Sequence, residues 1–185
     1  MTIFEKKKLE RDMYRKLRDK SSINQMENVK KNVKIYVDSF LKEDKKIGYI
    51  AIYWPLKNEV DIRSLKEKIS LALPRCKGKK ELLFYPWDEK PLTKDYEGIL
   101  SPNNSFSLSH EQISMILVPC LSVDRNLTRL GYGGGYFDKL RINKNWRNVP
   151  CIGVLTSNCV STIPLARAEW DISLSGFITE KEIFV

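Results

Sequence analysis

Short apolar segments rich in β-branched and aromatic residues recur along this chain of 185 residues, and helical patterns separate them. Five segments have the composition of buried strands: 47–55, 82–86, 114–119, 151–156 and 176–179. Buried strands that alternate with helices are typical of α/β folds with a parallel sheet. We therefore expect residues 1–185 to form a single α/β domain whose mostly parallel sheet is flanked by helices.

Two amphipathic helices are predicted in a basic N-terminal segment of about 42 residues, at 3–18 and 22–42. Apolar side chains recur there at the three- and four-residue spacing of one helix face. In the first helix this face carries Phe4, Leu9, Met13 and Leu17. A third stripe of the same spacing predicts a helix through residues 62–73, whereas the composition of residues 87–108 predicts irregular loop.

The chain is basic, with a net charge of +9, and the excess is unevenly placed. Residues 1–34 carry 11 basic and 5 acidic side chains. A basic end indicates an anionic partner, which leaves nucleic acid, a nucleotide, an acidic metabolite and an anionic membrane surface open.

Several protein classes do not fit the composition. No apolar stretch reaches the ~18 residues of a membrane span, and no apolar core follows the N-terminal charges as in a signal peptide. The four cysteines are scattered, and the chain has one histidine, which disfavours a zinc site. We therefore expect a cytoplasmic protein with packed thiols and no membrane partner.

The segment VPCLSVDRNLTRLGYGGGYFDKL, residues 118–140, departs from ordinary composition. It follows a buried strand as a long turn over 120–135, holds four of the nine glycines within five positions, and ends in a helix predicted from about Tyr136. Glycines let a ligand approach the backbone closely, and successive N–H groups can form a concavity that binds anions. The guanidinium of Arg129 adds a planar fork of hydrogen-bond donors. The carboxylate of Asp138 would repel a bare phosphate, so its position is explained if Mg²⁺ lies between the two.

Phosphate binding is not the only interpretation of this loop. The segment lacks the spacing of a Walker A loop and of G-x-G-x-x-G, so a glycine-rich turn with a structural role only is the alternative. The combination of Arg129, Tyr132, Tyr136 and Asp138 after a strand favours phosphate.

The same segment resembles the signature of the 5-formyltetrahydrofolate cyclo-ligases, also called 5,10-methenyltetrahydrofolate synthetases. The spacing D-x-x-x-x-R-L-G-x-G-x-G-Y-x-D is intact from Asp124 to Asp138. Other elements agree in order along nearly the whole chain: YWPLKNEVD at 53–61, a K-x-x-x-R pair in the first helix, and EWDISLSGFITE at 169–180. For that pair Lys7 and Arg11 fit best, and a register one residue earlier would select Lys6 and Glu10.

The resemblance implies a fold, a reaction and ligands. The fold is the three-layer architecture of the NagB/RpiA/CoA-transferase group. The reaction is ATP-driven cyclisation of 5-formyltetrahydrofolate to 5,10-methenyltetrahydrofolate, with Mg²⁺ as cofactor and ATP as co-substrate, in a monomer that acts on small molecules and binds no nucleic acid.

The resemblance also implies roles for residues of this chain. Its catalytic residues would be Arg129 and Tyr136, and its metal ligands Asp138 and Asp171. The ATP site would comprise Lys7, Arg11, Arg129, Leu130, Gly131, Tyr132, Gly133, Gly134, Gly135, Tyr136 and Phe137. The folate site would comprise Trp54, Glu59, Tyr132, Gly133, Gly134, Gly135 and Tyr136.

The chain departs from the family pattern at several positions, and none removes a group that the chemistry needs. Cys120 and Leu127 replace glycines, and Ser101 stands where the family often has Glu. Other departures are Val123, Phe137 and Ser175.

Two alternatives to the enzyme remain open from the sequence. One is a nucleic-acid-binding module that uses the basic helices, although residues 1–34 hold only Phe4 and Tyr14 as aromatic side chains for stacking. The other is a non-catalytic relative that binds nucleotide or folate.

Overall fold

A seven-stranded sheet forms the centre of the computed structural model, which describes residues 1–43, 48–78, 80–88 and 90–185. The strand order is β12-β11-β9-β6-β1-β2-β3, and the inner strands from β11 to β2 are parallel. The two edge strands pair antiparallel. The strands are β1 (Tyr49–Ala51), β2 (Leu71–Lys77), β3 (Glu81–Pro86), β6 (Ile113–Pro119), β9 (Cys151–Val154), β11 (Gly176–Ile178) and β12 (Ile183–Phe184). The predicted α/β class with a mostly parallel sheet is confirmed.

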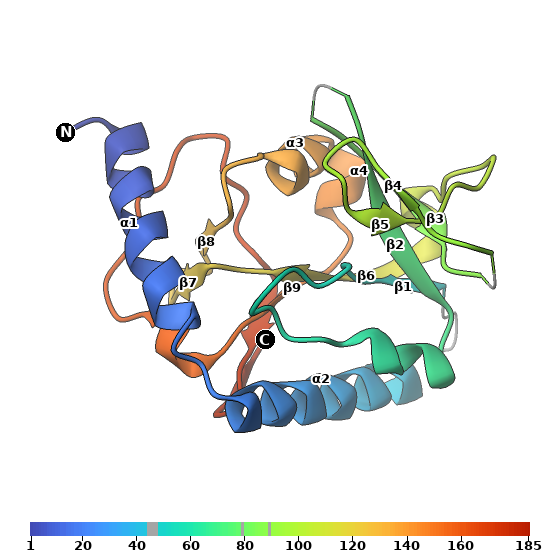
Figure 1. The fold of residues 1–185 in the computed structure, drawn as a ribbon, viewed down its shortest axis with the longest axis horizontal. Helices are drawn as coiled ribbons and strands as arrows, with labels where there is room; N and C mark the ends of the chain where they lie inside the picture. Colours follow the sequence, from blue (N-terminus) through green and yellow to red (C-terminus); the bar gives the residue numbers. More distant parts are fainter. Residues whose placement is uncertain (44–47, 79, 89) are drawn as a thin grey trace.

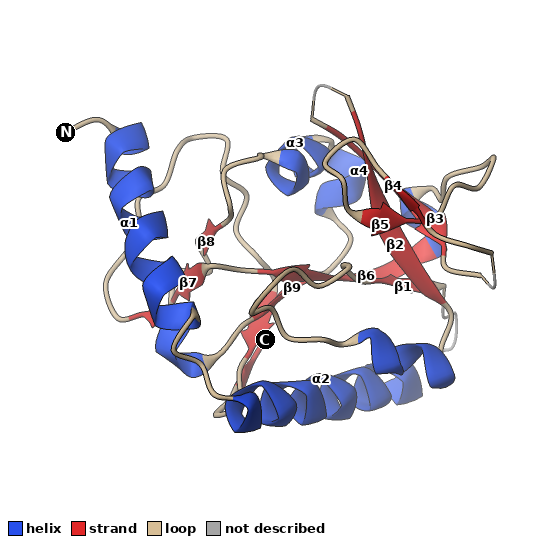
Figure 2. Ribbon diagram, viewed as in Figure 1, coloured by secondary structure: helices blue, strands red, loops and turns tan. Residues whose placement is uncertain are grey.

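Helices cover both faces of this sheet (Figures 1 and 2). They are α1 (Ile3–Arg18), α2 (Ile23–Glu43), α3 (Tyr136–Ile142) and α4 (Lys144–Arg147). Alternate residues of β1 and β6 belong to two separate cores: Ile50 and Met115 pack with α2, whereas Ala51 and Ile116 face the side of α3 and α4. This arrangement makes three layers, as expected for a buried parallel sheet.

Several short elements complete the connections. A 3₁₀ helix (Arg63–Glu67) links β1 to β2, and two further 3₁₀ turns lie at His110–Gln112 and Ser157–Cys159. A second sheet combines β7 (Ser122–Asp124), β8 (Arg129–Leu130) and β10 (Val160–Ser161), and β4 (Thr93–Lys94) pairs with β5 (Leu100–Ser101). The predicted long turn at 120–135 and irregular loop at 87–108 therefore contain short strands.

The predicted helix at 62–73 is wrong. Its first part is the 3₁₀ helix, and Leu71 and Leu73 belong to β2, which pairs parallel with β1. A strand buried on both faces lacks polar alternation, so its apolar residues can satisfy a helical spacing by coincidence.

The first helix forms as predicted, but the predicted apolar face is not the one that it buries. Leu9 and Met13 are 60% and 48% exposed, while Lys7 and Tyr14 are buried. The strand expected at 47–55 is also shorter than predicted: β1 ends at Ala51, and residue 47 lies outside the described residues. Among the described residues no helix is both long and apolar enough to cross a membrane.

Candidate active site

The sheet reverses its order of winding at β1. From β1 the chain passes to β2 on one side and later returns to β6 on the other. In open α/β sheets, ligands bind beyond the carboxyl ends of the strands at such a switch point. Trp54 follows the end of β1, and Pro119 ends β6; both line a cavity of about 580 Å³.

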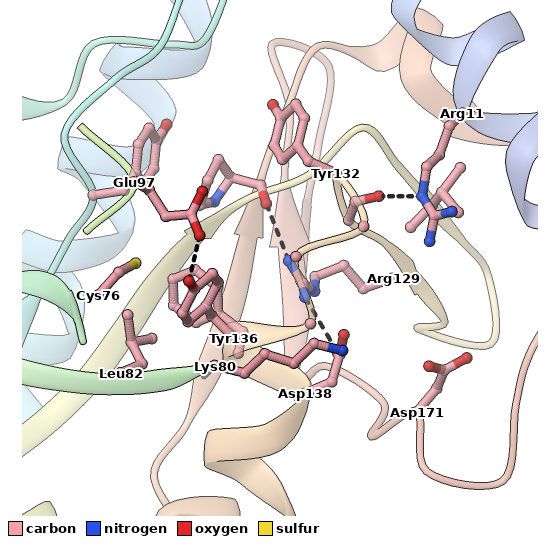
Figure 3. Close-up of a pocket in the computed structure, with 18 of the residues that line it drawn as sticks. Arg11, Cys76, Lys80, Leu82, Glu97, Arg129, Tyr132, Tyr136, Asp138 and Asp171 are labelled. Carbon is pink, nitrogen blue, oxygen red and sulfur yellow. Dashed lines mark hydrogen bonds and ion pairs between the residues drawn. The ribbon is translucent and has the colours of Figure 1, made fainter. Parts of the chain in front are cut away.

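This cavity brings together every site residue predicted from the sequence. Figure 3 shows Arg11, Arg129, Tyr132, Tyr136, Asp138 and Asp171 among the residues around it. The predicted residues in its walls come from α1, the segment after β1, the glycine-rich loop with the start of α3, and the segment before β11. The predicted residues that line it are Lys7, Arg11, Trp54, Glu59, Arg129, Leu130, Gly131, Tyr132, Gly133, Gly134, Gly135, Tyr136, Phe137, Asp138 and Asp171.

The glycine-rich loop needs glycine at two positions. Gly133 has a φ of +107° and Gly135 a φ of +71°. Residues that carry a side chain rarely adopt these backbone angles. Arg11 holds this loop, because its Nε donates to the carbonyl oxygen of Gly131 at 2.9 Å. The helix α3 begins at Tyr136, directly after the loop, as predicted.

Arg129 is an almost completely buried cation. Its side chain is 8% exposed, and it donates to Asp138 Oδ1 at 3.2 Å. Its guanidinium also lies 5.4 Å from the ring centre of Phe137. The Asp138 side chain is 30% exposed, so the carboxylate is the more accessible member of this pair.

Lys7 and Asp171 make a second ion pair across 164 positions of sequence. Their side chains are 11% and 10% exposed. Asp171 Oδ2 also accepts from the backbone N–H of Ala168 at 2.7 Å. Lys6, the alternative cation of the earlier register, is exposed on α1.

The carboxylates of Asp138 and Asp171 could bind a Mg²⁺ ion only together with another ligand. Among the described residues no cluster of three or more metal-ligating side chains occurs. Mg²⁺ usually binds through one or two carboxylates plus substrate phosphates, and Asp138 and Asp171 line one cavity with cations suited to phosphate. The donor set therefore fits an ion that arrives with a phosphate ligand.

Glu59 is a buried carboxylate at the cavity wall. Its Oε2 accepts from the N–H of Leu56 at 2.7 Å, while its Oε1 is buried without a hydrogen-bond partner among the described residues. Burial raises the pKa of Glu59, although the Tyr132 hydroxyl, the Leu56 N–H and Arg18 offset part of that rise. An unpartnered buried oxygen is costly and suits a ligand that donates a hydrogen bond.

Glu59→Gln is expected to raise the melting temperature at about pH 7.5 and to leave it unchanged at about pH 4. The folded protein binds this proton more tightly than the unfolded chain, because its pKa lies above the 4.5 of an ordinary glutamate. Ionisation of Glu59 therefore lowers stability as pH rises from about 4.5 through the raised pKa. Thermal melts at both pH values test this, and a lower melting temperature at pH 7.5 would contradict it.

Three residues in or beside the cavity wall were missed by the sequence analysis. Arg18 donates to the Tyr132 hydroxyl at 2.5 Å, Glu97 accepts from the Tyr136 hydroxyl, and Lys80 lies near Gly135. Arg18 follows Arg11 by seven positions and so lies two turns further on the same helix face, a signal that could have found it. Glu97 and Lys80 come from loops and had no local signal.

Three of the departures from the family pattern have structural explanations. Leu127 adopts a φ of +61°, so it keeps the left-handed turn that glycine would make without strain. Cys120 is buried in the core, where burial raises the pKa of its thiol to about 12 and keeps it neutral, in accord with a packing role. Ser101 is fully buried and accepts from Arg75 at 2.9 Å.

The fold and cavity together define an α/β protein with a cavity lined by cations and carboxylates at the carboxyl ends of its strands. Comparison with known proteins names the family. The model of the 5-formyltetrahydrofolate cyclo-ligase family matches residues 3–180, and the chain belongs to this family of enzymes.

Individual relatives agree with this assignment. A 5-formyltetrahydrofolate cyclo-ligase from Haemophilus influenzae is 27% identical over 72% of this chain and 76% of its own. The solution structure of a 5,10-methenyltetrahydrofolate synthetase from Aquifex aeolicus superposes with a TM-score of 0.76 and 29% identity, over 96% of this chain and 91% of its own. A synthetase structure from Mycoplasma pneumoniae, 23% identical with a TM-score of 0.70 over 94% and 98% of the two chains, shares the fold.

Proposed function

We propose that this protein catalyses the ATP-dependent cyclisation of 5-formyltetrahydrofolate to 5,10-methenyltetrahydrofolate, with release of ADP and phosphate. The observation that carries the proposal is the convergence of the glycine loop and of the cations and carboxylates predicted from the sequence on a single cavity. The predicted cations are Lys7, Arg11 and Arg129, and the predicted carboxylates are Glu59, Asp138 and Asp171.

The chemistry asks for positioning more than for covalent catalysis. A formyl oxygen is a poor leaving group, and phosphorylation makes it a good one before N10 closes the ring. In phosphoryl transfer, a protein contributes mainly alignment and stabilisation of developing charge. Buried Arg129 is suited to neutralise charge on the transferred phosphoryl group, and we assign it as a catalytic residue together with Tyr136.

The other groups bind and orient. Lys7 and Arg11 would close on the nucleotide from α1, and Gly133 to Gly135 would supply backbone donors to its phosphates. Asp138 and Asp171 would hold Mg²⁺, which supplies charge neutralisation between the phosphates when bound. At the far wall, Glu59 would accept a hydrogen bond from the pterin, and Trp54 and Tyr132 would pack on it.

A spectrophotometric assay tests the function. The protein is incubated with 5-formyltetrahydrofolate and Mg·ATP, and the absorbance of the methenyl product is followed. We expect a rise that requires both ATP and the divalent metal. A protein that binds ATP and folate but gives no rise would be the non-catalytic relative, and the enzyme proposal would fail.

The nucleic-acid-binding alternative loses part of its support. Three cations of the basic first helix, Lys7, Arg11 and Arg18, are engaged with residues of the cavity wall. Single-domain organisation of residues 1–185, a monomeric state and a cytoplasmic location stay predictions.

A further inference from the structure

Arg18, the last residue of α1, is a largely buried cation with one donor unpaired. Its side chain is 15% exposed. One terminal nitrogen donates to the Tyr132 hydroxyl at 2.5 Å, and the guanidinium lies 5.2 Å from the centre of the same ring. Its Nε is buried and has no hydrogen-bond partner among the described residues. Burying a cation with an unpaired donor costs stability, which indicates a role beyond packing.

Glu59 presents the complementary group, because its Oε1 is a buried acceptor without a partner among the described residues. Arg18 and Glu59 both line a second, small cavity of about 10 Å³. This small cavity adjoins the one of about 580 Å³, since Glu59 and Pro119 line both. A space of this size admits about one water molecule, so little solvent screens the two charges from each other there.

Tyr132 connects the two charged groups. Because Arg18 donates to the Tyr132 oxygen, the hydrogen of that hydroxyl is directed elsewhere. The Tyr132 hydroxyl lowers the pKa of Glu59, as a donor to a carboxylate does. Burial and then the charge of Glu59 raise the pKa of Tyr132, so its hydroxyl keeps the proton that it donates. The order of donation therefore runs from Arg18 through Tyr132 to Glu59.

The other ionisable groups around Glu59 are neutral or exposed to solvent. Burial raises the pKa of Tyr53, and it raises that of Cys120 to about 12, so both groups are neutral near pH 7. Asp19 follows Arg18 at the end of α1, but its side chain is 56% exposed and water screens its charge. The guanidinium of Arg18 is therefore the buried charge that acts on Glu59.

We propose that Arg18 is a positioning residue for the folate, a deepening that rests on the proposed function. It holds the Tyr132 hydroxyl against Glu59 and keeps a positive charge beside the carboxylate that accepts from the pterin. Arg18 does not itself line the cavity of about 580 Å³, so it acts through Tyr132 and Glu59 rather than on the substrate.

Folate binding as a function of pH measures this coupling. Calorimetry gives the Kd of 5-formyltetrahydrofolate, without ATP, from pH 5 to pH 9. Ionised Glu59 is the better acceptor, so wild-type affinity should fall as pH drops through the pKa of Glu59, which burial raises above 4.5. Losing an adjacent positive charge raises a carboxyl pKa further, by about one unit. Arg18→Gln should therefore move the midpoint up by about one pH unit and bind folate about tenfold more weakly at acidic pH, but nearly as the wild type does at pH 9.

Three further variants make the result specific. Arg18→Lys keeps the charge but loses the planar fork, so its midpoint should stay near the wild-type value while its affinity falls at every pH. Glu59→Gln should remove the pH dependence, which assigns the midpoint to Glu59. Arg15→Met is the matched control, because Arg15 lies on the same helix, is 44% exposed and lines neither cavity. It should keep the wild-type profile.

An unchanged midpoint in Arg18→Gln, or an affinity loss that is equal at every pH, would overturn the positioning role. So would the same upward shift in Arg18→Lys as in Arg18→Gln. Arg18→Met, which is also uncharged, repeats the test if thermal melts show that Arg18→Gln does not fold. A wild type that binds no folate would overturn both proposals. A wild type that binds folate without cyclising it would defeat the function alone, and the variants would still decide the role of Arg18.

Discussion

Arg129→Ala is expected to lower kcat/KM for the cyclisation by about 100-fold or more. Removing one preorganised donor from a site of developing charge typically costs 10²–10³-fold. Arg129 is 8% exposed, so its charge acts where water screens it little. The measurement is the initial rate of methenyl formation at saturating and limiting ATP.

Arg129→Lys separates charge from geometry. Lysine keeps the positive charge but loses the planar fork, so we expect an intermediate rate. A circular dichroism melt checks that each variant is folded, because Asp138 loses its partner in Arg129→Ala. Wild-type turnover by folded Arg129→Ala would remove Arg129 from the mechanism.

Lys7→Met is expected to lower both stability and nucleotide affinity. Breaking a buried ion pair leaves one uncompensated charge and costs about 3–5 kcal/mol, which corresponds to a fall in melting temperature of about 10 °C in a protein of this size. The Asp171 side chain is 10% exposed, so it is the charge left behind. Thermal melts and calorimetry with Mg·ATP measure the two effects.

The double variant Lys7→Met/Asp171→Asn distinguishes the two roles. It removes both charges, and the amide oxygen of the introduced asparagine can still accept from the N–H of Ala168, so stability should largely return while ATP affinity stays low. Lys6→Met is the control, because Lys6 is the exposed neighbour. If Lys6→Met lost ATP binding and Lys7→Met retained it, the nucleotide contact would belong to the earlier register.

The strands show where sequence patterns suffice. The segments 82–86 and 114–119 lie within β3 and β6, because a buried apolar run bounded by proline or polar residues has few other structures available. At residues 62–73 the apolar residues were compatible with either a helix or a strand. Leu71 and Leu73 belong to a strand because β2 pairs with β1.

The first helix shows the opposite case. Its predicted apolar face carries Leu9 and Met13, yet both are exposed, and the buried face carries Lys7 and Tyr14. Burial of Lys7 depends on Asp171, which lies 164 positions away. A periodicity rule weighs each residue by its own polarity and cannot anticipate a charged partner supplied by a distant segment.

Local sequence pattern is enough to predict the alternation that leads to an α/β fold and to identify the glycine-rich loop with its neighbours Arg129 and Asp138. These features are local, because each is formed by residues that lie close together along the chain. Other contacts arise only when the chain folds: Arg18 and Glu97 join the site, Lys7 pairs with Asp171, and Phe4 lies against Trp170. Parallel strands bring distant connections to one edge of a sheet, and such contacts follow from packing rather than from any local pattern.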